Sequence, residues 1–319
     1  MQALAELKDQ IRQALPELDV VIGWQQGYDA LHTSPLFIRT EEDIDKLVVN
    51  EFCVVNPASY LREMRGGKKV GLVLKGCDSR SVIQLIQEEL LKEDDITVFG
   101  FGCNGVLNHA KLQERFGDIG FIDAVENDGT TVAVSAGDKK ETVPFTEVCA
   151  EKCLTCSYPN TLQCTHFVGS EAAKKAEEDA ANPALEEFEK LSMDERFAFW
   201  QDQMRRCIRC YACRNACPMC VCKDHCLANS REPKWLSEDT DVQNNFMFQM
   251  IHVMHLAGRC VECGECERAC PMDIPIMLLR RKMAGIVRDV FAYNAGTNAE
   301  DTPPLMRFKV EEPTIEERH

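Results

Sequence analysis

The first half of the chain alternates short apolar runs with amphipathic ones. Leu18–Gly23, Val70–Lys75 and Ile96–Phe99 are apolar runs of strand length, and Ser79–Lys92 has the apolar period of a helix. A strand, a helix and a second strand in this order form a βαβ unit, whose two strands are parallel. The pattern therefore predicts an α/β domain built on a small parallel sheet.

Two other patterns belong to this half. Residues 1–15 are amphipathic with charges throughout, which predicts a helix and not an export signal. Phe121–Val125 and Thr131–Val134 flank the turn sequence Asn127-Asp128-Gly129. This arrangement predicts a hairpin at the edge of the sheet.

After Gly169 the pattern becomes helical. Ser192 and Glu195 form a capping-box sequence that predicts a helix start, and Asp241–Leu256 and Ile276–Tyr293 have helical periods. We therefore predict an α/β domain followed by an all-helical domain, with these boundaries: 1–170 for the first, 171–192 for a linker, 193–299 for the second and 300–319 for an extended tail.

Composition narrows the function. A net charge of −16 argues against nucleic acid as a partner, because binding it needs a basic surface. No apolar run approaches the ~20 residues of a membrane helix. Without an export signal we expect a cytoplasmic, reducing environment, in which the 18 cysteines are better explained as metal ligands than as disulfides.

The cysteines of the helical half repeat one spacing, C-x2-C-x2-C-x3-C-P, beginning at Cys207 and again at Cys260. In two-cluster ferredoxins three cysteines of such a run hold one [4Fe–4S] cluster and the fourth ligates the other cluster. Zinc sites use paired C-x2-C knuckles instead. The spacing predicts two clusters: the first on Cys207, Cys210, Cys213 and Cys270, the second on Cys260, Cys263, Cys266 and Cys217.

This module resembles the all-helical two-cluster ferredoxin domain found in the C-type iron–sulfur protein of heterodisulfide reductase and in the iron–sulfur protein of succinate dehydrogenase. The resemblance covers about residues 195–295 and rests on both cysteine motifs and the helical spacer between them.

Two groups of residues near the motifs stay outside this assignment. Cys220, Cys222 and Cys226 fall within seven residues, and the sequence leaves open whether they hold another metal with His225 or pack near a cluster. Further along, methionines and histidines at helical spacing are better explained as core side chains than as haem ligands: Met247, Met250, Met254, His252 and His255.

Cysteines also follow the predicted strands of the α/β half. Cys77 and Cys103 come directly after two of them, so both should lie at one edge of the parallel sheet, and Cys153 and Cys156 form a later C-x2-C. The second of these loops also reads G-x-G-x-x-G. A nucleotide site, with Asp123 near the position of a ribose-binding acid, is therefore an alternative.

This set resembles the coenzyme F-420 hydrogenase/dehydrogenase beta-subunit family over roughly residues 70–170. The matches are Gly76-Cys77, Gly102-Cys103, Cys153 with Cys156, and Val168-Gly169. The resemblance implies a third [4Fe–4S] cluster on Cys77, Cys103, Cys153 and Cys156. Residues before 70 differ from the family's flavin-binding start, so we expect this chain to share the family's cluster but draw no conclusion about its substrate. The rival ligand set is local: Cys149, Cys153, Cys156 and Cys164.

These features together predict an electron-transfer subunit without catalytic residues of its own. Iron–sulfur clusters pass single electrons between partners that do the two-electron chemistry. The partners expected are redox subunits: a formate dehydrogenase, a hydrogenase or an NAD(P)H-oxidising flavoprotein, with heterodisulfide-reductase-like subunits. The alternatives are a reductase with bound FAD that oxidises a hydride-carrying coenzyme itself, and a zinc-stapled module. The basic triplet Arg280-Arg281-Lys282 is either a docking site for an acidic partner or a solvated helix face.

The role of Cys53 is not assigned by any of these patterns.

Overall fold

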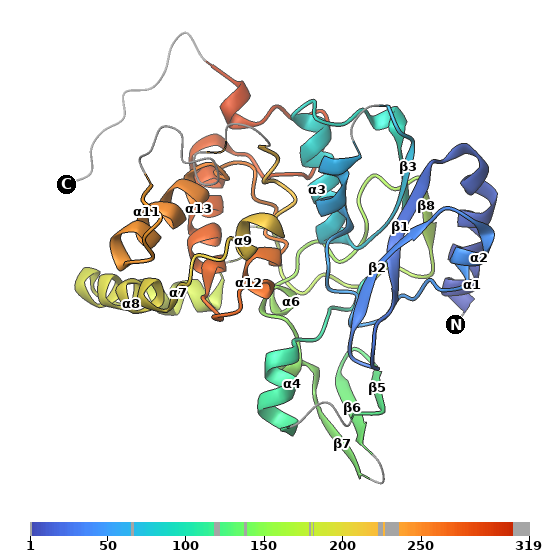
Figure 1. The fold of residues 1–319 in the computed structure, drawn as a ribbon, viewed down its shortest axis with the longest axis horizontal. Helices are drawn as coiled ribbons and strands as arrows, with labels where there is room; N and C mark the ends of the chain where they lie inside the picture. The colour runs from blue at the N-terminus through green and yellow to red at the C-terminus, as the bar shows by residue number, and fades with distance from the viewer. Residues whose placement is uncertain are drawn as a thin grey trace.

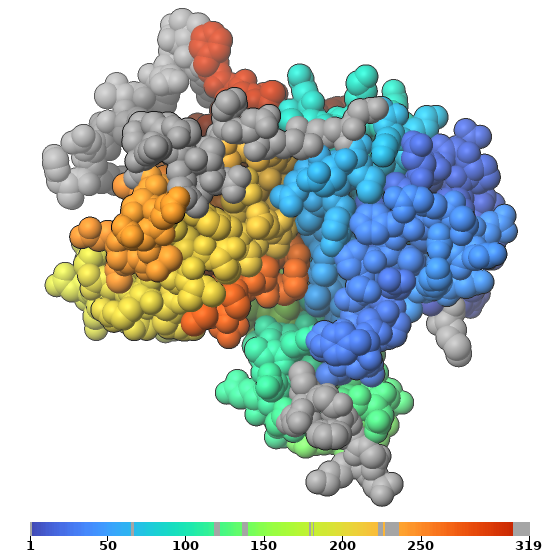
Figure 2. Space-filling view, in the orientation of Figure 1, coloured from blue at the N-terminus to red at the C-terminus, as the bar shows by residue number. Residues whose placement is uncertain are grey.

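The structure is a computed structural model, and it describes residues 2–64, 67–117, 122–136, 139–178, 180, 182–222, 226 and 236–308. An α/β half and a helical half lie side by side, and a small β-lobe projects from the α/β half (Figures 1 and 2). Among the described residues, no helix has the length and apolar character that a membrane span requires.

A five-stranded sheet forms the centre of the α/β half, in the order β2-β1-β3-β4-β8. The predicted parallel sheet is present, since β1, β3, β4 and β8 are parallel neighbours, but the sheet is mixed because β2 pairs antiparallel with β1. The sequence analysis missed β2, whose Pro35 is tolerated because the strand lies at an edge. The strands are β1 (Val20–Gln26), β2 (Thr33–Ile38), β3 (Val70–Leu74), β4 (Ile96–Phe101) and β8 (His166–Val168).

Helices cover both faces of this sheet (Figure 1). Alternate strand residues point to opposite faces, so Val21 and Val73 pack with α1 while Ile22 and Leu72 pack with α3. The predicted N-terminal helix is confirmed, and the predicted helix after β3 begins three residues earlier and ends at Gln87. The bounds are α1 (Gln2–Ala14), η1 (Leu15–Glu17), α2 (Glu41–Ile44), η2 (Pro57–Glu63), α3 (Gly76–Gln87) and η3 (Glu93–Asp95).

The predicted hairpin exists, but it does not extend the parallel sheet. Its strands β5 (Ala124–Asn127) and β6 (Thr131–Ala136) form a separate antiparallel sheet with β7 (Lys139–Pro144). This lobe has its own apolar core, to which Val132, Val134 and Phe145 contribute. A hairpin pattern specifies only the pairing of its own strands, so the sequence could not place it. Short helices flank the lobe: α4 (His109–Phe116), α5 (Phe145–Val148) and α6 (Glu151–Leu154).

The second half is helical, as predicted. Ser192 accepts a hydrogen bond from the amide of Glu195 and caps α8, so the predicted capping box is confirmed. The described helices are α7 (Pro183–Glu189), α8 (Met193–Arg206), α9 (Ala212–Asn215), α11 (Val242–Met254), α12 (Glu265–Arg268), α13 (Ile276–Phe291) and η5 (Pro304–Met306). Helix α7 lies inside the segment predicted as a linker, and residues 309–319 of the predicted tail lie outside the described residues.

The two halves share a core. Met219 and Leu256 of the helical half pack in the same apolar cluster as Leu72 and Val82. Helix α3 therefore lies between the sheet and the helical half. The first cysteine of the predicted third cluster, Cys77, sits in the first turn of this helix.

Candidate iron–sulfur sites

The structure brings together the four cysteines predicted for the first cluster. Cys207, Cys210, Cys213 and Cys270 line one small cavity, to which α11 and the first residue of α13 also contribute. The sulfur of Cys213 lies 3.9 Å from the amide nitrogen of Gln249, which is buried on α11. Cys210 is exposed, so this site reaches the protein surface.

The two cysteine loops have the same backbone conformation. In the first loop Arg209 and Tyr211 adopt left-handed φ angles of 48° and 61°, and in the second loop Glu262 and Gly264 adopt 58° and 74° at the equivalent positions. A left-handed non-glycine residue costs about 1–3 kcal/mol and persists only where the surroundings impose it. The repeated turns give the two loops the same course, and in the first loop all three cysteines line the cavity described above.

The second predicted set also converges. The charge of Cys217 acts on the pKa of Cys260, Cys263 and Cys266, so the fourth cysteine of the first motif faces the second loop. Cys263 and Cys266 are buried. The fourth cysteine of each motif therefore lies beside the loop of the other motif.

Burial keeps these thiols protonated unless a metal is bound. It raises the pKa of Cys103, Cys213 and Cys260 to about 11. A buried thiolate without a counter-charge is unfavourable, and a metal centre supplies that charge and deprotonates the thiol outright. Clustered buried thiols of high pKa therefore fit an iron–sulfur site and not a group of reactive cysteines.

The cysteines that follow the first motif take different positions. The sulfur of Cys220 lies 3.2 Å from Nε2 of His252, and Cys217 completes a group whose ligand atoms lie within 4.8 Å of one another. Cys226 is buried and accepts a hydrogen bond from Nε of Arg214, whereas Cys222 is exposed. His225 lies outside the described residues.

A third group of cysteines meets in the α/β half. Cys77, Cys103, Cys153 and Cys156 line one cavity of about 390 Å³ at the carboxyl edge of β3 and β4. Two backbone amides point at these sulfurs, each at 3.4 Å: Gly105 N–H donates to Cys103 and Val106 N–H donates to Cys153. Amide hydrogen bonds of this kind stabilise thiolate charge in iron–sulfur sites.

The two cysteines that are unique to the rival set, Cys149 and Cys164, lie outside this cavity. Cys149 is fully buried in the core of the β-lobe, where its thiol donates to the carbonyl oxygen of Thr146. Cys164 packs against a different apolar cluster, the one that contains the buried residues of α3. Neither side chain lines the cavity that Cys153 and Cys156 share with the strand loops.

The glycines of the loop after β4 do not form a phosphate cradle. A Cβ atom at Gly100 would lie 2.6 Å from Thr161, and one at Gly102 would lie 2.5 Å from the carbonyl oxygen of Ser170. Protein atoms therefore fill the space that a phosphate would need. In addition, the helix that follows this loop in the chain begins only at His109, so the loop does not lead directly into a helix N-terminus as a dinucleotide-binding loop does.

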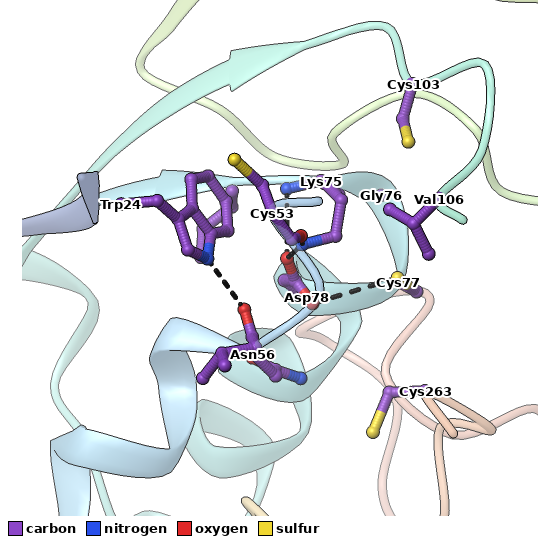
Figure 3. A network of polar contacts seen from close by, with 12 residues as sticks. Trp24, Cys53, Asn56, Lys75, Gly76, Cys77, Asp78, Cys103, Val106 and Cys263 are labelled. Atoms are coloured by element: carbon purple, nitrogen blue, oxygen red, sulfur yellow. Dashed lines mark hydrogen bonds and ion pairs between the residues drawn. The ribbon is translucent and has the colours of Figure 1, made fainter. Parts of the chain in front are cut away.

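A buried ion pair fixes the first turn of α3 beside this cavity (Figure 3). The Nζ atom of Lys75 lies 2.7 Å from Oδ2 of Asp78, and both side chains are almost fully buried. Lys75 also donates to the carbonyl oxygen of Cys53 at 2.6 Å and lies 4.2 Å from the centre of the Trp24 ring. The pair lies on both sides of Cys77 in the chain. The sequence analysis missed this pair, although a lysine at the end of an apolar strand could have signalled it.

Lys152 joins the α/β cavity to the second ferredoxin loop. It precedes Cys153, and its Nζ donates to the carbonyl oxygen of Cys263. Burial acts to lower the pKa of Lys152, but nearby negative groups, among them Cys77 and Cys263, hold it above its usual value. Figure 3 shows Cys77 and Cys263 on the same side of the Lys75–Asp78 pair. The third group of cysteines and the second predicted cluster are thus neighbours.

Two surface expectations need correction. In the basic triplet only Lys282 is exposed, because Arg280 and Arg281 are 1% and 6% exposed, so neither a basic docking patch nor a solvated face exists there. The methionines of α11 are not core side chains, since Met247, Met250 and Met254 are about half exposed. In a helix that is apolar on several faces, the sequence period cannot tell which face is buried.

Comparisons with known proteins support a 4Fe-4S dicluster domain in the helical half. The family of 4Fe-4S dicluster domains matches residues 203–274. The F420-dependent formate dehydrogenase subunit beta of Methanocaldococcus jannaschii is 24% identical, over 92% of this chain and 90% of that protein. The F420-dependent formate dehydrogenase 1 subunit beta of Methanococcus maripaludis is 23% identical, over 90% of this chain and 89% of that protein.

One solved structure is a distant match. A chain of the xenon-derivatised F420-reducing [NiFe] hydrogenase complex from Methanosarcina barkeri is 19% identical, with a TM-score of 0.38 over 50% of this chain and 59% of that one. This likeness is too low to carry an argument. The sequence comparisons confirm both resemblances: the chain contains a 4Fe-4S dicluster domain and is similar, along about nine tenths of its length, to beta subunits of F420-dependent formate dehydrogenases.

Proposed function

We propose that this chain is an iron–sulfur subunit that relays electrons between the redox subunits of a cytoplasmic complex. The observation that carries the proposal is the succession of three cysteine groups, from the α/β cavity through the second ferredoxin loop to the first. Lys152 connects the first two of these groups, and exposed Cys210 brings the last to the surface. Neighbouring clusters of this kind pass electrons one at a time.

We assign three [4Fe–4S] clusters to the chain. The first ferredoxin cluster takes Cys207, Cys210, Cys213 and Cys270, and the second takes Cys217, Cys260, Cys263 and Cys266. The third takes Cys77, Cys103, Cys153 and Cys156. This assignment is supported by the cavity that these four side chains line and that Cys149 and Cys164 do not line. Each cluster supplies one-electron chemistry, and the protein supplies position, burial and hydrogen bonds.

The relatives suggest the partners. Both curated relatives are beta subunits of F420-dependent formate dehydrogenases. We therefore propose that this chain works beside a subunit that oxidises formate, or a hydrogenase or heterodisulfide-reductase-like subunit in the same position. A pull-down of the anaerobically purified full chain, followed by mass spectrometry, identifies that subunit. Recovery of no redox protein under conditions that preserve the clusters would contradict a relay within a complex.

The cluster number is tested by iron content. Four irons per cubane give about twelve per chain for three clusters and about eight for two. Cys103→Ala should lower the content by about four irons, while the matched variant Cys164→Ala leaves it unchanged, because only Cys103 lines the cavity. Loss of iron in Cys164→Ala with full retention in Cys103→Ala would overturn the third assignment and leave the ferredoxin clusters in place.

A second candidate is a flavin-containing reductase. The cavity of about 390 Å³ continues beyond the cysteines to Tyr158, Arg288 and Asn294, so it offers room for an organic group beside the third cluster. Denaturation of the anaerobically purified chain should release FAD if this candidate is correct. A protein without flavin that still passes electrons from a reduced viologen to an acceptor supports the relay alone.

A further inference from the structure

Arg280 is a buried cation at the centre of the helical half. It lies on α13 and is 1% exposed. Its Nη atoms contact the carbonyl oxygen and the ring Nδ1 of His252, and its Nε has no hydrogen-bond partner. In the part of the chain that the structure describes, no carboxylate lies within ion-pair distance of it. A buried charge of this kind is costly unless another charge compensates it.

The thiolates of the second cluster would supply the compensating charge. Burial acts to lower the pKa of Arg280, and negative charge on Cys266, Cys260, Cys217 and Cys220 raises it; the first three belong to the ligand set proposed above. A cubane with four thiolates is anionic, and it gains one more negative charge when it is reduced. A fixed buried cation beside it therefore stabilises the reduced state more than the oxidised state.

Arg280 also sets the tautomer of His252. Nη2 of Arg280 lies 2.7 Å from Nδ1 of His252, and Nη1 donates to the carbonyl oxygen of the same residue at 2.7 Å. A guanidinium group only donates hydrogen bonds, so Nδ1 must be the acceptor, and the neutral ring carries its proton on Nε2. That nitrogen lies 3.2 Å from the sulfur of Cys220 and donates to it.

This tautomer excludes a separate metal site at the same place. Cys217, Cys220 and His252 have ligand atoms within 4.8 Å of one another. A metal at Nε2 would need a free lone pair there, which the bond from Arg280 to Nδ1 removes from a neutral ring. His252 is therefore a hydrogen-bond donor in this arrangement. The sulfur of Cys220 in turn lies within 4.8 Å of the sulfur of Cys217, so the polar chain from Arg280 ends beside a proposed cluster ligand.

We propose that Arg280 and His252 act together as positioning residues that raise the reduction potential of the second ferredoxin cluster. The inference rests on the relay proposed above, in which this cluster is the middle member. In the step concerned the cluster takes one electron from a reduced one-electron carrier, which is thereby oxidised, and no proton moves. With a raised potential, the middle cluster is the one of the three on which an electron preferentially resides.

The test is a redox titration of the anaerobically purified full chain with viologen dyes, followed by electron paramagnetic resonance. In Arg280→Met the equilibrium constant for reducing the second cluster should fall at least tenfold, which is 59 mV for one electron. The first cluster should change less. Cys263→Ala and Cys210→Ala assign the two signals. The matched control is Lys282→Met, which removes an exposed cation from the same helix and should shift neither cluster.

Two further variants keep the test decisive if Arg280→Met fails to bind iron. Arg280→Lys retains the charge and should shift the potential less than Arg280→Met does. His252→Phe keeps the stacked ring beside Phe248 but loses the N–H donor, so it should lower the same potential. An unchanged potential in Arg280→Met or, where that variant binds no iron, in His252→Phe at full iron content would overturn the proposal.

Two other outcomes are separated by metal analysis. One zinc per chain that is lost in His252→Phe would mean that His252 is a metal ligand, which contradicts the proposed tautomer. An iron content of about eight would remove the third cluster from the relay but would leave the shift at the second cluster measurable.

Discussion

The ion pair between Lys75 and Asp78 gives a prediction whose size follows from burial. The two side chains are 2% and 0% exposed and lie 2.7 Å apart. Removing one partner of a buried pair leaves an uncompensated charge and costs about 3–5 kcal/mol. Asp78→Asn should therefore lower the free energy of unfolding of the α/β half by about that amount, and its melting temperature by about 6–20 °C.

Removing both charges should restore most of this loss. The double variant Lys75→Met with Asp78→Asn has no buried charge left at this position. It still leaves the carbonyl oxygen of Cys53 without its donor, which lies 2.6 Å away in the native chain. That unsatisfied acceptor costs about 1–3 kcal/mol, so the double variant should be more stable than Asp78→Asn and less stable than the native chain.

The assay is thermal unfolding of the anaerobic full chain followed by circular dichroism, with iron content as a second readout. The matched control is Glu126→Gln, which removes an ion pair of nearly the same length, 2.8 Å, on the surface of the β-lobe. Solvent screens that pair, so the control should unfold close to the native chain. Equal melting temperatures for Asp78→Asn and Glu126→Gln would refute the reasoning.

The contact between the halves and the surface of α13 give two more predictions. Arg80→Met removes hydrogen bonds to the carbonyl oxygens of Val261 and Ala295, so we expect the free energy of unfolding to fall by about 3 kcal/mol and amide hydrogen exchange at residues 293–298 to become faster. The control is Arg12→Met, which removes a partly exposed side chain of α1. Unchanged exchange there would show that Arg80 does not fasten this segment. Lys282→Glu should change the rate of electron transfer from a partner by less than about twofold at low salt, because its neighbours Arg280 and Arg281 are buried. A larger, salt-dependent change in stopped-flow kinetics would restore the docking role of this helix.

The sequence by itself determined the elements and the motif. Apolar runs of strand length and a helical run predicted β3, α3 and β4, because local periodicity depends only on which residues follow one another. The doubled cysteine spacing predicted the dicluster domain for the same reason: three ligands of a cubane come from one short loop, whose spacing is visible in the sequence.

The tertiary structure decided whatever depends on contacts between distant segments. It placed the hairpin in a separate lobe, brought the strand loops to Cys153 and Cys156, and buried Arg280 while exposing Lys282 on the same helix. No local pattern carries this information, because burial of a side chain depends on which other segment packs against it. The pairing of Arg280 with His252, 28 residues earlier in the chain, exists only because α13 packs against α11.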